Sequence, residues 1–259
     1  MLTEETLHKG LSTKRFGKKI YTFETIDSTN NCARALAGCW AAEGTVVISE
    51  QQTLGRGRHG RAWQANPLEN LTFSLILRPT VPPDYMNLLP LYVAVAVAKA
   101  VEDSTGLQVE CKWPNDLLVH GRKFAGILLE GAVKESSLEY VVVGIGLNVN
   151  QVKFDGDLEH RATSLRLECG REIDRVGLFR GILASLEDHY HEITASNAQT
   201  ILPTWLSHCT MLNKQISVST NGSIISGVVK GVSREGGLIL QSDGSEQTLY
   251  AGDVTILGT

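Results

Sequence analysis

Paired cysteines, long apolar runs and an excess of one charge are all missing from this sequence. The five cysteines form no C-x-x-C pair, so neither a disulfide framework nor a zinc site is indicated. The longest nearly apolar stretch, residues 88–98, is about half of a membrane span and contains a proline. The first 19 residues lack the apolar segment of a secretory signal. These absences predict a soluble, reduced, cytoplasmic protein that does not enter a membrane.

The overall composition is that of an ordinary globular protein. Hydrophobic residues make up 42% and charged residues 20% of 259 residues, and the net charge is −4. Such a charge argues against a surface that binds nucleic acid throughout. The length fits one large domain with a smaller one.

The pattern of predicted secondary structure changes near residue 212. Before it, extended runs and helical patterns mix, with a meander of strands over 107–150 and amphipathic helices at 175–194 and 197–208. After it, five short β-rich runs are separated by glycine-containing turns, which is typical of a small barrel or sandwich. We therefore expect two domains, residues 1–212 and 213–259. The fold class is α/β (α+β), a mixed sheet flanked by helices with a small all-β domain.

The first strong helical pattern follows the sequence DSTN. Five apolar residues share one face of it, namely Ala33, Leu36, Ala37, Trp40 and Ala41. Asp27 or Ser28 is a suitable N-cap. The hydroxyl and amide groups of this segment either cap the helix or bind a neutral polar ligand.

The sequence GRGRHGR, residues 55–61, places three arginines and three glycines between two predicted strands. Glycines let the backbone approach a ligand closely, and guanidinium groups bind carboxylate or phosphate. An anion-binding loop, a solvated basic turn and an RNA contact are all compatible with the pattern. No Walker A sequence occurs in the chain.

Two lysines flank a predicted hairpin. Lys112 ends one strand before Trp113-Pro114-Asn115-Asp116, and Lys123 begins another. Both ammonium groups can converge on a phosphate, although exposed hairpins also carry lysines for solubility. The later sequence GIGLN, residues 144–148, lacks the third glycine and the helix start of a dinucleotide-binding fingerprint, which leaves Asn148 at a strand end.

Taken in order, DSTN, EQQTLGRGRHGRAW, KWPNDLLVHGRKFAGILLEG and GIGLNVN resemble the biotin–protein ligase family from about residue 20 to the end. The resemblance implies a class II synthetase-like catalytic domain with an SH3-like C-terminal barrel. It implies that biotin and ATP form biotinyl-5′-AMP, and that biotin then passes to a lysine of a biotin carboxyl carrier protein of acetyl-CoA carboxylase. Mg²⁺ follows from the ATP chemistry, its ligands stay unassigned, and a homodimer is an expectation.

The resemblance also assigns residues to roles. The residues expected to act in catalysis are Lys123 and Arg58. Those expected to bind biotin are Ser28, Thr29, Asn30, Gln52, Arg56, Gly57, Arg58 and Lys123. Those expected to line ATP are Arg58, Arg61, Trp63, Lys112, Asn115 and Asn148. Because biotin's carboxylate must approach a negatively charged α-phosphate, the cations among them have a clear electrostatic purpose.

Two departures from the family pattern and three alternatives accompany this interpretation. Residues 1–19 are too few for the winged-helix domain of some members, so DNA binding is not expected. The C-terminal VTILGT lacks a terminal arginine, so we assign residues 213–259 no ligand contact. The alternatives are a lipoate–protein ligase, which uses the same adenylation, a non-enzymatic RNA-binding protein that uses GRGRHGR, and a biotin-sensing regulator.

Overall fold

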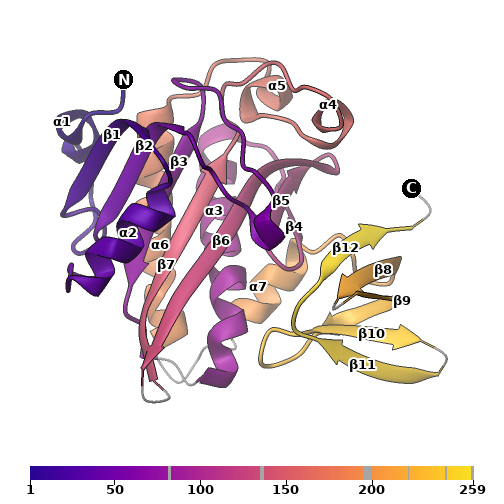
Figure 1. Ribbon diagram of the computed structural model, residues 1–259. Coiled ribbons are helices and arrows are strands. Elements are labelled where there is room, and N and C mark those ends of the chain that lie inside the picture. The colour runs from indigo at the N-terminus through magenta and orange to yellow at the C-terminus, as the bar shows by residue number, and fades with distance from the viewer. Residues whose placement is uncertain (81–82, 135–136, 195–199, 221, 243, 258–259) are drawn as a thin grey trace.

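The computed structural model describes residues 1–259 except 81–82, 135–136, 195–199, 221, 243 and 258–259. Figure 1 shows a large part that mixes helices with a sheet and a small part made of strands. The helices are α1 (Glu4–His8), α2 (Thr29–Gly38), α3 (Leu89–Thr105), α4 (Leu158–Arg161), α5 (Leu165–Cys169), α6 (Arg175–Thr194) and α7 (Ile201–Ser207). Two short 3-10 helices are η1 (Arg58–Gly60) and η2 (Pro83–Leu88).

The large part is built on a seven-stranded sheet in the order β1-β2-β3-β7-β6-β5-β4. Its strands are β1 (Ile20–Ile26), β2 (Val46–Gln52), β3 (Leu71–Leu77), β4 (Glu110–Lys112), β5 (Asp116–Val119), β6 (Arg122–Lys134) and β7 (Ser137–Leu147). Only β1 and β2 are parallel, so the sheet is mixed. The four neighbouring strands β4 to β7 confirm the predicted meander.

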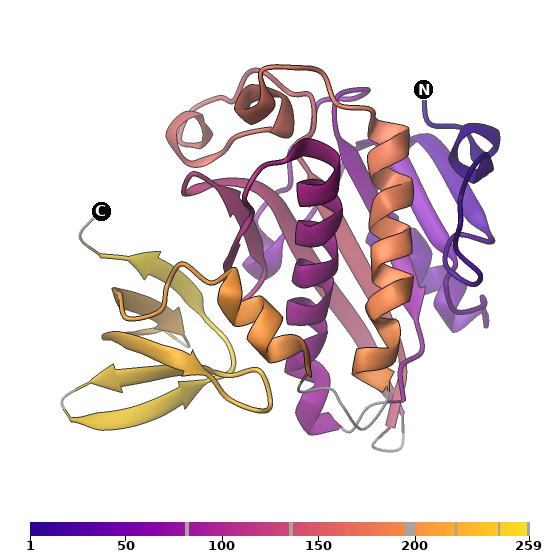
Figure 2. The same cartoon turned by 180° about the vertical axis from the view of Figure 1, so that it is seen from behind.

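Helices cover both faces of this sheet. Helix α2 packs on one face, and α3 and α6 pack on the other, where the main core lies (Figures 1 and 2). Strand β3 is buried at every position because both of its faces are covered. Helix α3 starts with Pro90 in its first turn and ends at Gly106, which takes a φ of +75° that suits glycine.

The small part is a five-stranded antiparallel sheet in the order β11-β10-β9-β8-β12. Its strands are β8 (Gln215–Thr220), β9 (Ser223–Val232), β10 (Leu238–Ser242), β11 (Ser245–Leu249) and β12 (Asp253–Ile256). It joins the large part directly, because the Trp113 indole donates to the carbonyl of Gly236 at 3.1 Å. The predicted fold class is confirmed.

Two of the sequence predictions concern helices. The helix predicted at 197–208 is present as α7, while residues 197–199 lie outside the described residues. No helix in the described part of the chain is long and apolar enough to cross a membrane.

Candidate active site

Three glycines form the floor of a site on the α2 face of the sheet. Gly126 on β6 pairs with Gly146 on β7, and Gly144 lies two residues earlier on the same face. A Cβ on Gly144 would lie 2.2 Å from Asn30 Oδ1, and one on Gly146 would lie 2.4 Å from Trp63 Cε2. The alternating glycines of GIG therefore lie on one face of a strand, where the lack of a Cβ allows the Asn30 and Trp63 side chains to contact the backbone.

Buried polar groups at the start of α2 gather beside this floor. The backbone N–H and the hydroxyl of Thr29 both donate to Gln52 Oε1, at 2.7 and 3.0 Å. The hydroxyl of Ser74 on β3 lies 2.8 Å from Thr29 Oγ1 and 2.6 Å from Asn30 Oδ1. Ser28 is the N-cap, but its side chain makes no capping bond. Gln52 Nε2 donates to no partner among the described residues, so its amide N–H groups are available to a ligand.

Glu130 on β6 links this cluster to the loop 55–63. Its Oε2 accepts from Asn30 Nδ2 at 2.7 Å, and its Oε1 lies 3.4 Å from Arg56 Nη2. Arg56 also donates to Asn31 Oδ1 at 2.6 Å. Ser74 and Glu130 were not expected from the sequence. Each is a polar residue in a largely apolar strand, on the same face as the glycines.

The loop closes on itself and over the floor. The N–H of Gly57 donates to Arg61 O at 2.7 Å, and that of Trp63 donates to Gly55 O at 2.9 Å. The Trp63 ring lies on the glycine floor with Lys123 Nζ 5.7 Å from its centroid. Its buried Nε1 has no hydrogen-bond partner among the described residues, which marks a donor available to a ligand.

The two hairpin lysines do meet, around one carboxylate. Lys123 Nζ lies 2.6 Å from Asp116 Oδ1. Burial lowers the pKa of Lys112, and the charge of Asp116 opposes that shift while Arg161 and Lys123 add to it. Asp253 also opposes the shift, so the cations lie beside two carboxylates; groups of like charge held together in this way are typical of an anion site.

The remaining arginines of the loop reach the C-terminal sheet. Arg58 donates to Gly252 O at 3.1 Å and lies 3.3 Å from Asn115 Oδ1. The Asp253 carboxylate pairs with Arg61 and lies 3.9 Å from Arg58 Nη1. Burial lowers the pKa of Arg58, and Asp253 opposes this. The sequence assigns residues 213–259 no ligand contact, and β12 acts on the site through the loop, whose counterion it supplies.

Asp253→Asn is expected to loosen the loop before ligands bind. Partly exposed pairs of this kind contribute about 0.2–1 kcal/mol each, so the fold should persist while amide exchange of residues 52–63 speeds up several-fold. Hydrogen exchange of the protein without ligands measures this. Glu246→Gln, an exposed acid on β11, is the matched control. Equal exchange in the Asp253 variant and the wild type would contradict the interpretation.

Asn115 and Asn148 hold backbone segments around the cations. Asn115 Nδ2 donates to Ile127 O at 2.7 Å, which fixes the end of β5 against β6. Asn148 Nδ2 donates to Thr163 O at 3.1 Å and is buried. Each amide thus keeps at most part of its hydrogen-bonding capacity for a nucleotide.

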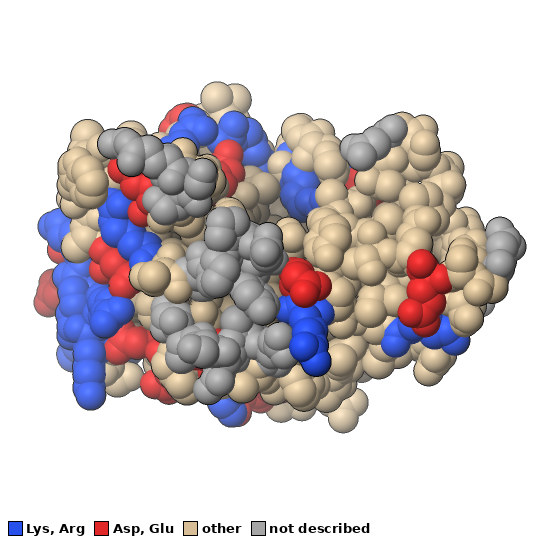
Figure 3. All heavy atoms as spheres, turned by 90° about the horizontal axis from the view of Figure 1, so that it is seen from below, with Lys and Arg blue, Asp and Glu red and all other residues tan. Residues whose placement is uncertain are grey.

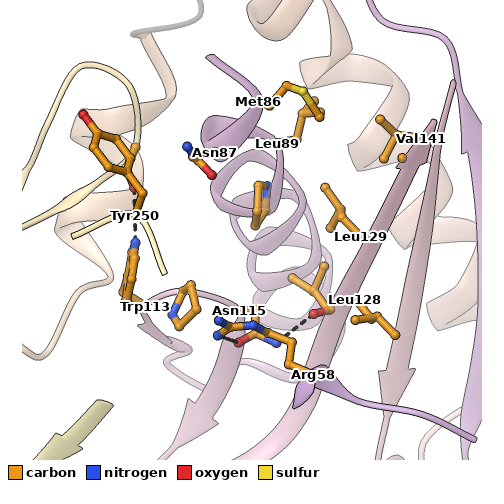
Figure 4. A pocket seen from close by; sticks show the side chains of 15 residues that line it. Arg58, Met86, Asn87, Leu89, Trp113, Asn115, Leu128, Leu129, Val141 and Tyr250 are labelled. Atoms are coloured by element: carbon orange, nitrogen blue, oxygen red, sulfur yellow. Dashed lines mark hydrogen bonds between the residues drawn. The ribbon is translucent and has the colours of Figure 1, made fainter. Parts of the chain in front are cut away.

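A cavity of about 250 Å³ opens next to Arg58 and Asn115. Figure 4 shows apolar side chains of η2, α3, β6 and β7 on one side and Trp113 with Tyr250 on the other. The cavity borders the part of β6 beyond Ile127, where β5 no longer pairs with it. It therefore lies between Arg58 and the edge of β6 that has no partner on the β5 side among the described residues.

Comparisons with known proteins agree with this arrangement. Residues 22–148 match the model of the biotin/lipoate A/B protein ligase family, and residues 211–257 match the biotin protein ligase C-terminal domain. The bifunctional ligase/repressor BirA of Bacillus subtilis is 34% identical over 98% of this chain and 79% of its own length. This chain belongs to the biotin protein ligase family.

Other family members extend the comparison. The biotin–[acetyl-CoA-carboxylase] ligase of Mycobacterium tuberculosis is 33% identical over 87% of this chain and 83% of its own length. A biotin protein ligase from Aquifex aeolicus, solved in complex with biotin and ATP, superposes with a TM-score of 0.80 at 25% identity and covers 93% of this chain and all of its own.

In this member of the biotin protein ligase family, four sequence motifs converge on one region. The DSTN segment and Gln52 lie at one end of the glycine floor, the loop with Trp63 lies over it, and Lys112 with Lys123 lies at the other end. Asn148 lies farther out, tied to Thr163. The roles of these residues in binding remain proposals.

Proposed function

We propose that the protein joins biotin to AMP at the expense of ATP and then transfers the biotinyl group to a lysine of a carrier domain. One observation carries the proposal: a group of hydrogen-bonding side chains, Thr29, Asn30 and Gln52, and a group of cations lie at opposite ends of one glycine floor. Biotin has the matching form, a neutral ureido ring at one end and a carboxylate at the other. The Aquifex aeolicus relative was solved with biotin and ATP.

The group of hydrogen-bonding side chains suits the ureido ring. Its carbonyl needs donors, which the free amide N–H groups of Gln52 supply, and its N–H groups need acceptors such as the Ser28 hydroxyl. Arg56 and Asn30, both held by Glu130, lie on the side of β6. The aliphatic chain of biotin then lies along the glycine floor, in the place that the Trp63 ring occupies in this structure.

The cation cluster suits the adenylation step. A carboxylate oxygen of biotin attacks the α-phosphorus of ATP, the bond to the bridging oxygen breaks, and diphosphate leaves with the electron pair. Arg58, Lys112 and Lys123 neutralise the charge that concentrates on the phosphate in this step. The loop and Trp63 exclude water, which would hydrolyse the mixed anhydride. In the second step the carrier lysine's amine attacks the biotinyl carbonyl and AMP leaves.

Mg²⁺ fits the residues present. Among the described residues, no group of three or more His, Cys, Asp or Glu side chains is placed to hold a metal ion. Mg²⁺ needs only one or two carboxylates when phosphates and waters complete its shell, and Asp116 faces the cluster. When bound, the ion would add positive charge at the phosphates.

The carrier partner fits the free edge of β6. Beyond Ile127 this strand has no partner on the β5 side among the described residues, and the edge runs along the cavity beside Arg58. An extended segment that adds to this edge would bring its lysine to the adenylate. The same edge offers the expected homodimer contact. The relatives' name points to acetyl-CoA carboxylase as the carrier's source.

The place of action that we propose is the cytoplasm. All five cysteines are unpaired, with Cys111 and Cys209 buried in the structure. A chain with free thiols suits a reducing compartment, where biotin-dependent carboxylases also need to be modified.

Transfer of biotin to a carrier domain tests the function. The protein is incubated with ATP and a purified biotin carboxyl carrier domain, once with biotin and once with lipoate, and the transferred group is identified by mass. We expect biotin to be added only when ATP is present. Transfer of lipoate without biotin would favour the lipoate–protein ligase alternative instead.

Salt and RNA separate the ligase from its most different rival. On the face seen in Figure 3, lysines and arginines are interspersed with acidic residues instead of forming a basic stripe. We therefore expect no measurable binding of a short single-stranded RNA at about 150 mM salt. Under the same conditions biotin with ATP should raise the melting temperature by several degrees. Tight RNA binding without that shift would favour the RNA-binding alternative over the ligase.

A further inference from the structure

Arg161 is a cation at the site that belongs to none of the four motifs. It is the last residue of α4, and the following residue, Ala162, pairs with Lys123 as an isolated bridge. The N–H of Thr163 donates to Lys123 O at 2.9 Å. The chain after α4 is therefore fixed to the start of β6, and Figure 1 shows α4 beside that end of the sheet.

The charge of Arg161 reaches the buried lysine across the hairpin. Burial lowers the pKa of Lys112 most, and Arg161 lowers it further, ahead of Lys123. Among the described residues no carboxylate lies within ion-pair distance of Arg161, whereas Asp116 pairs with Lys123. Three cations thus lie beside two carboxylates, Asp116 and Asp253, and Asp253 also pairs with an arginine of the loop. The cations in this arrangement repel one another, and a bound anion would relieve that repulsion.

We propose that Arg161 binds the β- and γ-phosphates of ATP and the diphosphate that leaves. The inference rests on the proposed adenylation. Arg58, on the loop, and Lys123, beside the floor, lie where biotin's carboxylate and the α-phosphate meet. Arg161 is exposed to solvent whereas Lys112 is half-buried, so Arg161 lies on the outer side of the cluster. Negative charge grows on the diphosphate as the bond to the α-phosphorus breaks, and a planar guanidinium donates hydrogen bonds to two of its oxygens.

Binding measurements with Arg161→Ala test this. Calorimetric titration with inorganic diphosphate, and with ATP, should show affinity reduced about tenfold, as expected for one charge-assisted contact. Affinity for biotinyl-5′-AMP should be unchanged, because that molecule lacks both outer phosphates. Arg161→Lys keeps the charge without the fork and should recover only part of the loss.

Arg166→Ala on α5 is the matched control, since Arg166 is also an exposed arginine and its backbone N–H donates to Val149 O, away from Lys123. Two results would overturn the inference: diphosphate and ATP bound as tightly as by wild type, or affinity for biotinyl-5′-AMP lowered by the same factor. Arg161→Gln provides a second neutral variant if alanine disturbs α4. A wild-type protein that bound diphosphate but made no adenylate would count against the proposed function alone.

Discussion

Lys123→Ala is expected to slow the formation of biotinyl-5′-AMP by at least about 10²-fold while the protein stays folded. The ammonium lies between Asp116, at 2.6 Å, and the ring of Trp63, at 5.7 Å from the centroid. Without it, the carboxylates of biotin and Asp116 both face the α-phosphate with one cation fewer. The initial rate of diphosphate release at saturating biotin and ATP measures the effect.

The controls for Lys123 address charge and shape separately. Lys99→Ala removes an exposed lysine that pairs with Asp103 at 3.7 Å on α3, which packs on the face of the sheet opposite to the glycine floor, and should leave the rate unchanged. Lys123→Arg keeps the charge but replaces a compact ammonium by a planar fork, and should recover little. An alanine variant that releases diphosphate at the wild-type rate would remove Lys123 from the reaction.

Gly144→Ala should lower kcat/KM for biotin by about 10²-fold, because it displaces a binding group by a large part of an ångström. The added Cβ would lie 2.2 Å from Asn30 Oδ1 and 2.9 Å from its Cγ. Asn30 cannot move aside easily, since Ser74 and Glu130 both hold it. Overpacking of this kind also costs about 1–3 kcal/mol of stability. The kinetics are measured below the melting temperature of the variant.

Gly38→Ala serves as the control, because it replaces a glycine by alanine without the steric clash expected at Gly144. Gly38 is the last residue of α2, and a Cβ added there would meet no atom within 4 Å, so Gly38→Ala should be neutral or slightly stabilising. The ATP affinity of the Gly144 variant should change less than its biotin affinity, because the cation cluster lies at the other end of the floor. Equal kcat/KM for the Gly144 variant and the wild type would contradict the assigned position of biotin.

Periodicity and turn residues were sufficient to predict most of the large elements. The meander of β4 to β7 followed from its turns, and the five C-terminal strands followed from their spacing. The predicted apolar face of α2 was wrong at Trp40, which is 75% exposed. The helix ends at Gly38, and Trp40 takes a φ of +61° beyond it, so 3.6-residue spacing no longer applies there.

The site was predictable only where its residues are close together in sequence. DSTN, the arginine loop and the lysine hairpin stand out because several chemical groups occur within a few residues. Ser74, Glu130 and Asp253 are single polar residues in strands, and only strand register and the packing of the two sheets bring them to the site. Short helices such as α4 also escape prediction, since tertiary contacts and not intrinsic propensity stabilise them.

The position of Trp63 on the glycine floor gives the protein a built-in optical probe. Of its four tryptophans, Trp40 is largely exposed, and Trp113 and Trp205 are only 2% and 1% exposed. Trp40 and Trp205 do not line the cavity beside Arg58, and Trp113, which does, is held by its bond to Gly236 O. Trp63 rests on Gly126 and Gly146 beside an ammonium, so its emission is the one that responds when biotin or an adenylate takes its place. Each step of the cycle can then be timed by intrinsic fluorescence, without a label.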